Sequence, residues 1–172
     1  STSRSIDVTT LASGGAALPT LPIGMFSSAH PMYIPGTKDT VNFFFDSVCK
    51  TLSDTATSTL AVYRVLSGST DYDVLFKVEL PNLPYMHSFA VTENFLVLYV
   101  NPTNIDPICM TNFTGKSFPG MGSCFIPATE SVDTVAVVIM KLSGDSAGEL
   151  MGVSLVPSQM VFHTINAFES ND

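Results

Sequence analysis

The stretch MHSFAVTENFLVLYV, residues 86–100, decides the fold of this chain. It contains two runs of apolar and β-branched residues, and the polar triplet TEN at 92–94 lies between them. Such runs favour β-strands, and a short polar interruption is typical of a turn. We therefore predict a hairpin here, with a histidine, His87, near the start of its first strand.

The same pattern recurs along the chain. Turn signals such as PGTKD, SGSTD, PNLP and SGDSAG separate short segments rich in β-branched and aromatic residues. No apolar period of 3.6 residues persists over ten residues, which argues against helices. We predict an all-β fold, with further strands at about 41–49, 58–66, 73–80, 132–142, 149–156 and 160–168.

Many short strands with regular turns are typical of a sandwich, a barrel or a propeller. Two segments, 95–100 and 135–140, are apolar throughout instead of alternating with polar residues. Such strands are usually buried on both faces. We therefore expect a layered or radial architecture in preference to a sandwich with one solvated face.

The composition excludes several classes of protein. Charged residues make up only 13% of the 172 residues and hydrophobic residues 45%, with a mean hydropathy of +0.33. The longest apolar runs have six residues, whereas a membrane-spanning helix needs roughly 20. The net charge of −8 and the scattered basic residues argue against nucleic acid as a partner.

Three cysteines, Cys49, Cys109 and Cys124, form no metal-binding pair of the CxxC type. The polar N-terminus does not resemble a signal peptide. We therefore expect reduced thiols that pack as small buried hydrophobes, in a protein located in the cytoplasm or a plastid, with peripheral membrane contact as a further expectation.

Residues 101–127 break the regular pattern of strands and turns. The segment is long and rich in proline and glycine, and yet it is apolar. Loops of this length are usually functional or disordered, and disorder normally accompanies low hydrophobicity. We predict an apolar insertion loop that binds a ligand or contacts a membrane through Ile105, Ile108, Met110, Phe113 and Phe118.

The chain has only three histidines, and each lies near the start of a strand-like segment. They are His30, His87 and His163, separated by 57 and 76 positions. A propeller blade takes roughly 40–50 residues. A separation of 57 allows one blade with modest loops, and 76 allows one blade plus the insertion at 101–127. Each histidine can therefore come from the same position of successive blades. Neutral imidazoles that converge on an axis form a metal site, for zinc or for iron. The alternative is that the three histidines are core residues with ordinary hydrogen bonds.

The local sequences around the histidines carry a resemblance. AHP at 29–31, HSFAVTEN at 87–94 and FHTINAFE at 162–169 follow one another in the order seen in the carotenoid cleavage oxygenase family. The second and third motifs are specific, and the first is short. YVNP at 99–102 and FIP at 125–127 also resemble pieces of that family. The resemblance covers about residues 25–170.

The resemblance implies a seven-bladed β-propeller with Fe(II) on its axis, held by four histidines. His30, His87 and His163 would be three of these ligands, while the fourth histidine and the glutamates that orient the ligands would lie outside the chain. We therefore expect residues 1–172 to be a single partial domain, an internal fragment of about three blades, that does not fold well by itself. Within the motifs, we expect Glu93 and Glu169 to make structural contacts and not catalytic ones.

The resemblance also implies a reaction. Family members of the oxygenase type use ferrous iron and dioxygen to cleave one C=C bond of a carotenoid or apocarotenoid, which gives two carbonyl products. The insertion at 101–127 corresponds to an apolar patch that dips into membranes to collect such substrates. The alternatives are a retinoid isomerohydrolase or a cleaver of non-carotenoid alkenes within the same family, or a non-catalytic remnant.

Overall fold

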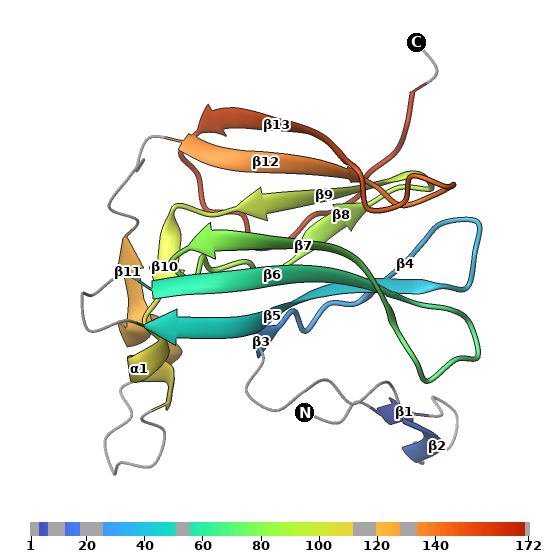
Figure 1. The fold of residues 1–172 in the computed structure, drawn as a ribbon, viewed down its shortest axis with the longest axis horizontal. Coiled ribbons are helices and arrows are strands. Elements are labelled where there is room, and N and C mark those ends of the chain that lie inside the picture. Colours follow the sequence, from blue (N-terminus) through green and yellow to red (C-terminus); the bar gives the residue numbers. More distant parts are fainter. Residues whose placement is uncertain are drawn as a thin grey trace.

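A computed structural model of the chain describes residues 4–6, 13–17, 26–50, 56–111, 120–127 and 134–170. Two multi-stranded antiparallel sheets lie side by side (Figure 1). In the first sheet, β5, β6 and β7 follow one another, while both β3 and β4 pair with the free edge of β5. Its strands are β3 (Phe26–Ser27), β4 (Met32–Tyr33), β5 (Thr40–Lys50), β6 (Ala56–Val65) and β7 (Asp73–Pro81).

The second sheet is a four-stranded meander in the order β13-β12-β9-β8. Its strands are β8 (Phe89–Val91), β9 (Phe95–Val100), β12 (Thr134–Lys141) and β13 (Leu150–Pro157). Two smaller antiparallel pairs complete the strands that the structure describes. They are β1 (Arg4–Ile6) with β2 (Ser13–Ala17), and β10 (Thr103–Ile105) with β11 (Phe125–Pro127).

The predicted hairpin at 86–100 is confirmed. Its strands β8 and β9 pair in the register Phe89 with Leu98 and Val91 with Leu96. The turn is closed by Thr92, whose backbone N–H donates to the Phe95 carbonyl at 2.8 Å and whose hydroxyl accepts the Phe95 N–H at 2.9 Å. The predicted strands at 41–49, 58–66, 73–80, 132–142 and 149–156 are also confirmed, as β5, β6, β7, β12 and β13.

The strand predicted at 160–168 is wrong. This segment pairs with no sheet and is irregular. Much of it is exposed, with Ile165 at 102% and Phe168 at 82% of full accessibility. Its backbone is held instead by the side chains of Ser88, just before β8, and Asn101, just after β9, which replace the hydrogen bonds of a ladder.

Burial on both faces is found in β5, β6 and β8 and not in the two strands for which we predicted it. In β9 the residues Leu96 and Leu98 are fully buried, whereas their neighbours are only half-buried, and in β12 Ile139 is exposed. In β5, by contrast, Phe43, Phe44 and Phe45 are all buried. Consecutive side chains of a strand point to opposite faces, so both faces of β5 are covered.

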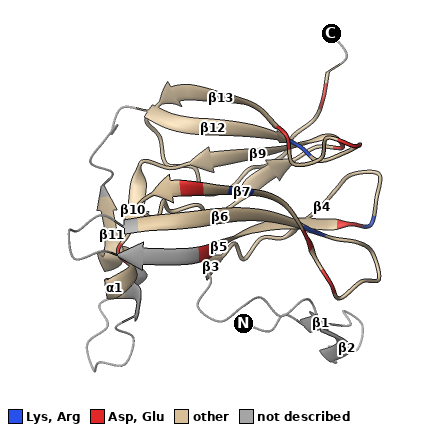
Figure 2. Ribbon diagram, viewed as in Figure 1, with Lys and Arg blue, Asp and Glu red and all other residues tan. Residues whose placement is uncertain are grey.

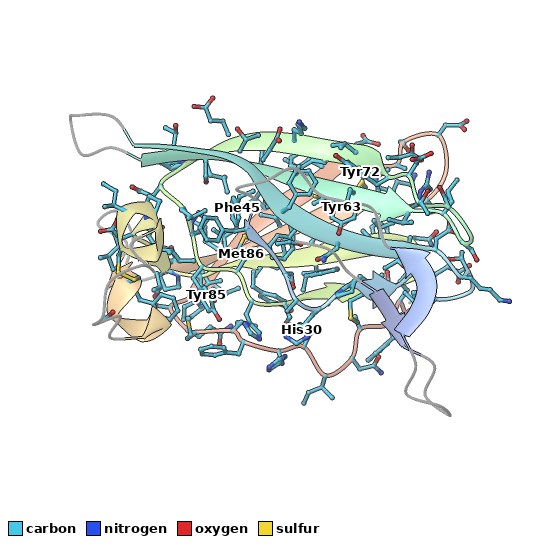
Figure 3. The ribbon with its side chains drawn as sticks, turned by 90° about the horizontal axis from the view of Figure 1, so that it is seen from below. His30, Phe45, Tyr63, Tyr72, Tyr85 and Met86 are labelled. Carbon is cyan, nitrogen blue, oxygen red and sulfur yellow. A yellow bond between two sulfur atoms is a disulfide. The ribbon has the colours of Figure 1, made fainter. Side chains whose placement is uncertain are left out.

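The main core fills the space between the two sheets. Phe43 of β5 packs against Phe89 of β8 with ring centroids 5.6 Å apart and nearly perpendicular rings, a favourable arrangement for aromatic pairs. On the other face of β5, Phe44 packs against Tyr63 and Tyr72. Figure 3 shows Tyr63 and Tyr72 together, away from His30. β5 therefore joins the main core to a smaller aromatic cluster.

Figure 2 shows many of the charged residues in turns and at strand ends, and a few within the strands, such as Lys77 in β7 and Asp46 in β5. The ion pair between Lys77 and Asp46 joins β7 to the edge of β5 across the intervening strand. Within the described part of the chain, neither helix has the length and apolar character that crossing a membrane requires.

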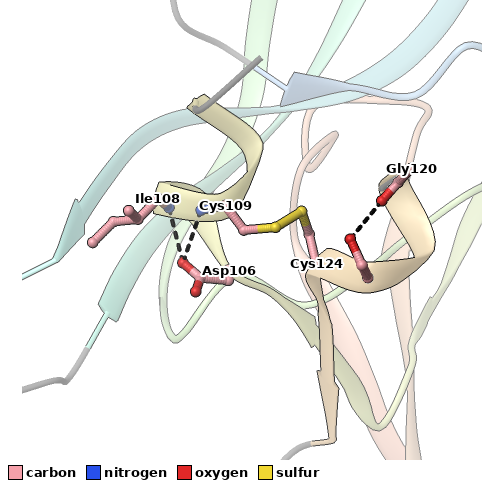
Figure 4. The surroundings of a disulfide bond; sticks show 6 residues. Asp106, Ile108, Cys109, Gly120 and Cys124 are labelled. Carbon is pink, nitrogen blue, oxygen red and sulfur yellow. Dashed lines mark hydrogen bonds between the residues drawn. A yellow bond between two sulfur atoms is a disulfide. The ribbon is translucent and has the colours of Figure 1, made fainter. Parts of the chain in front are cut away.

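The segment predicted as an insertion loop has local structure in its described parts. It contains the pair β10–β11, the short helix α1 (Pro107–Thr111) and a 3₁₀ turn, η1 (Met121–Cys124). Asp106 begins α1 as its capping residue, because its carboxylate accepts the N–H groups of Ile108 and Cys109 (Figure 4).

The expectation of reduced thiols is wrong for Cys109 and Cys124. These cysteines form a disulfide between α1 and η1, with Cα atoms 5.5 Å apart (Figure 4). The side chain of Cys49 lies outside the described side chains. Disulfides persist mainly in oxidising compartments, so the disulfide weakens the reason for expecting a cytosol-like compartment, and the location of the protein stays a prediction.

A substitution at Gly148 tests the close contact between the two sheets. It lies in the turn before β13 with φ of +92°, and an added Cβ would come within 3.0 Å of the Leu75 carbonyl group in β7. We expect Gly148→Ala to lower the free energy of unfolding by more than about 1 kcal/mol, measured by chemical denaturation. Gly144→Ala is the matched control, because Gly144 has φ of +72° and no neighbour within 4 Å. Equal losses in the two variants would contradict close packing at Gly148.

Candidate metal centre

His30 lies in a gap in the edge strand of the first sheet. The short strands β3 and β4 both pair with β5, Phe26 with Phe45 and Met32 with Val41, so they form one edge strand interrupted at 28–31. Leaving the ladder frees the backbone around His30 to turn. His30 is half-buried as a result.

His87 and His163 approach the same place from the second sheet and from the segment that follows it. His87 comes two residues before β8, which is the edge strand of its sheet. His163 lies in the irregular segment 158–170 and is exposed. Figure 3 shows His30 and Tyr85 on one side of the molecule, where this C-terminal segment runs past them.

The three imidazoles meet at one point. Nε2 of His30 lies 2.9 Å from Nε2 of His87. The ring centroids are 4.7 Å apart for His30 and His87, 4.9 Å for His30 and His163, and 4.8 Å for His87 and His163. One ligand atom from each ring lies within 4.8 Å of the others. The structure therefore brings together all three histidines that the sequence suggested as ligands.

The donor set fits a divalent transition metal. Two imidazole nitrogens bound to one ion at 2.0–2.1 Å lie roughly 3.0–3.4 Å apart, close to the observed separation of the His30 and His87 nitrogens. Imidazole suits zinc, iron, copper and nickel. His163 adds a third imidazole nitrogen, within 4.8 Å of the other two.

The protonation of His87 also suits metal binding. Burial, together with the neighbouring His30 and His163, lowers the pKa of His87 from its ordinary value. A lowered pKa keeps the ring neutral at pH 7, and only the neutral ring can bind a metal.

Tyr85 is a neighbour of the site that the sequence did not single out. Its hydroxyl lies 2.7 Å from Nδ1 of His87, and burial raises the pKa of the phenol. When Nε2 of His87 binds a metal, Nδ1 carries the proton and donates to the Tyr85 oxygen. Its position two residues before His87, on the same side of an extended segment, is the only signal of this contact in the sequence.

An apolar cavity of about 250 Å³ between the two sheets reaches His87. Its walls combine aromatic side chains of the first sheet with the segment that leads into β8, and His87 lines one part of it. The lining residues include Phe26, Phe43, Phe45, Tyr85, Met86 and Ile105. Apolar walls with a few polar groups are typical of a ligand site.

The five residues predicted for membrane or substrate entry do not share one environment. Ile105 is 8% exposed and packs in the main core, so it is not a surface residue, because its strand β10 is covered by the neighbouring segments. Ile108 in α1 is 51% exposed. The side chains of Met110, Phe113 and Phe118 lie outside the described residues.

The family model for RPE65, the retinal pigment epithelial membrane protein, matches residues 1–172, the whole chain. The chain belongs to this family. A search of curated proteins finds no match. The resemblance to the carotenoid cleavage oxygenases, drawn from the histidine motifs, is thereby confirmed.

Solved structures of the RPE65 family's fold resemble the chain over 96% of its length. A variant of the Synechocystis apocarotenoid oxygenase (ACO) matches with a TM-score of 0.61 and 21% identity. A chimera of ACO and RPE65 matches with 0.59 and 22%, and cobalt-substituted Synechocystis ACO with 0.55 and 21%. In each case the chain spans about a third, 33%, of that protein. The expected all-β class, as part of a β-propeller, is confirmed.

In this RPE65-family chain, Glu169 connects the motif at 162–169 to the motif at 87–94. The carboxylate accepts the Asn94 backbone N–H and the Asn94 side-chain amide, both at 2.9 Å. Asn94 in turn accepts the Ser143 hydroxyl at 2.5 Å. The structural role expected for Glu169 is therefore confirmed. Hydrogen bonds from Thr92 and Asn94 lower the pKa of Glu169 from its ordinary value of 4.5.

This contact predicts a pH dependence of stability. The lowered pKa favours the folded state above pH 4.5, and the contribution is lost as the pH falls below 4.5 through the lowered value. We expect Glu169→Gln to be less stable than the wild type at pH 7, with the difference shrinking in acid, as measured by denaturation between pH 3 and 7. Glu149→Gln, at an exposed turn outside this contact, is the control. A difference that does not change with pH would contradict the assignment.

Proposed function

We propose that this chain is part of a non-haem Fe(II) dioxygenase that cleaves a C=C bond of a carotenoid or apocarotenoid to give carbonyl products. The observation that carries the proposal is the meeting of His30, His87 and His163, which come from three separate segments, with ligand atoms within 4.8 Å of one another. Family membership supports the same enzyme class.

The three histidines would hold the iron through their imidazole nitrogens. Neutral nitrogen ligands suit Fe(II) and leave coordination positions open. When bound, ferrous iron supplies the centre at which dioxygen is activated. Tyr85 would hold the Nδ1 proton of His87, which directs the Nε2 lone pair toward the ion. The chain has three histidines in all, so a fourth histidine ligand is not part of it.

The apolar cavity supports a lipid-soluble substrate. Its aromatic walls would exclude water from the space beside His87 and would pack against an apolar chain. The exposed side chain of Ile108 supports a peripheral contact of the α1 region with a membrane surface. Through that contact the enzyme would collect substrate from the lipid phase. Dioxygen would be the second substrate.

A second candidate keeps the same metal site with different chemistry. The matching family model is that of RPE65, the retinal pigment epithelial membrane protein, which favours a retinoid isomerohydrolase as the alternative. Cleavage of a non-carotenoid alkene is a further variant. The three histidines would serve each of these reactions equally.

Removal of single ligands tests the metal site. We expect His87→Ala and His163→Ala to abolish iron binding by the full-length protein, because each removes one of the converging nitrogens. Bound iron is measured by elemental analysis after anaerobic loading. Ile165→Ala is the matched control, since Ile165 lies two residues from His163 and is fully exposed. Stoichiometric iron in either histidine variant would refute the ligand assignment.

Labelled dioxygen distinguishes the candidate reactions. We expect ¹⁸O from ¹⁸O₂ in the carbonyl products of a polyene substrate, because oxygenase cleavage transfers oxygen atoms from dioxygen to carbon. Products are reduced to alcohols at once, which stops exchange with water, and are analysed by mass spectrometry. Conversion with no label in any product would exclude oxygenase chemistry and favour the isomerohydrolase.

A further inference from the structure

Ser28 connects the backbones of two of the histidines. Its hydroxyl donates to the carbonyl oxygen of His87 at 2.7 Å and accepts the backbone N–H of His30 at 3.1 Å. The side chain bridges the gap in the edge strand of the first sheet to the segment before β8. Ser28 is only 8% exposed, so these hydrogen bonds do not compete with bulk water.

Asn101 makes an equivalent connection for His87 and His163. Its amide nitrogen donates to the carbonyl oxygens of Tyr85 and Val161, both at 3.0 Å, and its amide oxygen accepts the Val161 N–H at 2.9 Å. Tyr85 and Val161 each lie two residues before a histidine. The side chain is 3% exposed, and one buried amide therefore fixes the distance between two histidine-bearing segments.

Ser88 adds a third connection beside the imidazoles. Its hydroxyl donates to the Phe162 carbonyl oxygen at 2.6 Å, and in the opposite direction the Thr164 hydroxyl donates to the Phe89 carbonyl oxygen at 2.7 Å. These bonds hold both sides of His163. Since the segment 158–170 forms no ladder, such side-chain bonds carry the positioning that a sheet would otherwise provide.

We propose that Ser28, Ser88 and Asn101 are positioning residues that hold the backbones of the three histidines at the separation a shared metal ion needs. The inference rests on the proposed metal site and extends it from the imidazoles to the hydrogen bonds between their segments. Their hydrogen bonds described above go to backbone groups and not to the imidazoles. They keep the segments of His30 and His163 from moving apart in the metal-free protein. Metal binding then loses less conformational entropy, because these segments are already in place.

Cobalt binding by the full-length protein tests the proposal. Co(II) is a suitable probe because its visible absorption reports coordination geometry, and a related ACO has been crystallised with cobalt. We expect Asn101→Ala to weaken Co(II) affinity by about 10-fold or more and to alter the absorption bands. Ser58→Ala is the matched control, because Ser58 is also buried and donates to a carbonyl oxygen, that of Asn82, away from the histidines.

Paired variants at the serines separate positioning from general stability. Ser28→Ala and Ser88→Ala remove the bridging hydroxyl, and we expect weaker Co(II) binding from both. Ser28→Thr and Ser88→Thr keep a hydroxyl, and we expect their Co(II) affinities to stay within about threefold of the wild-type value. Losing an outer hydrogen-bond partner of a metal ligand typically lowers metal affinity by about 10–100-fold. If Asn101→Ala does not fold, these four variants carry the test.

The outcomes distinguish this inference from the proposed function. Cobalt binding that is lost in His87→Ala but unchanged in Asn101→Ala, Ser28→Ala and Ser88→Ala would overturn the positioning role and leave the metal site intact. A His87→Ala variant that binds cobalt as tightly as the wild type would overturn the metal site. Equal weakening in Ser58→Ala and Ser88→Ala would show a general loss of stability and would also overturn the positioning role.

Discussion

Three imidazoles lie together, with ligand atoms within 4.8 Å of one another, although the chain places them 57 and 76 positions apart, and much of the described structure is arranged around this meeting. A continuous ladder would hold His30 within the edge strand of its sheet. The edge strand is instead broken at 28–31, between β3 and β4, and β8 begins only after His87. The backbone thus gives up strand hydrogen bonds where the histidines lie. The packing of Phe43 against Phe89 keeps the two sheets together next to this opening.

Buried polar side chains supply what the interrupted ladders lose. Ser28, Ser88 and Asn101 all donate to backbone carbonyl groups of other segments. An unpaired buried carbonyl or amide is costly, so these side chains both satisfy the backbone and set the distance between segments. Glu169 and Asn94 do the same at the solvent side. Histidine positioning and fold stability therefore depend on the same hydrogen bonds.

The segment 101–127 combines two roles. Its strands β10 and β11 and the buried Ile105 belong to the core, whereas Ile108 reaches the surface. The disulfide between Cys109 and Cys124 closes the part of the segment between α1 and η1. Closing a loop of this length stabilises a fold by about 3 kcal/mol in the chain-entropy model. The disulfide thereby links α1, which carries the exposed Ile108, to η1, while Ile105 in the same segment lines the cavity at His87.

The sequence by itself determined the strands β5, β6, β7, β12 and β13 and the hairpin at 86–100, because β-propensity and turn chemistry act over a few residues. It also indicated the three histidines and the family, because the motifs at 87–94 and 162–169 are local. Only the tertiary structure decided that 160–168 is not a strand, that Ile105 is buried and that two cysteines pair. It alone revealed the roles of Tyr85 and Asn101. Apart from the contact of Tyr85 with His87, these features depend on contacts between segments 15 to 74 positions apart, which arise from tertiary packing and leave no local pattern.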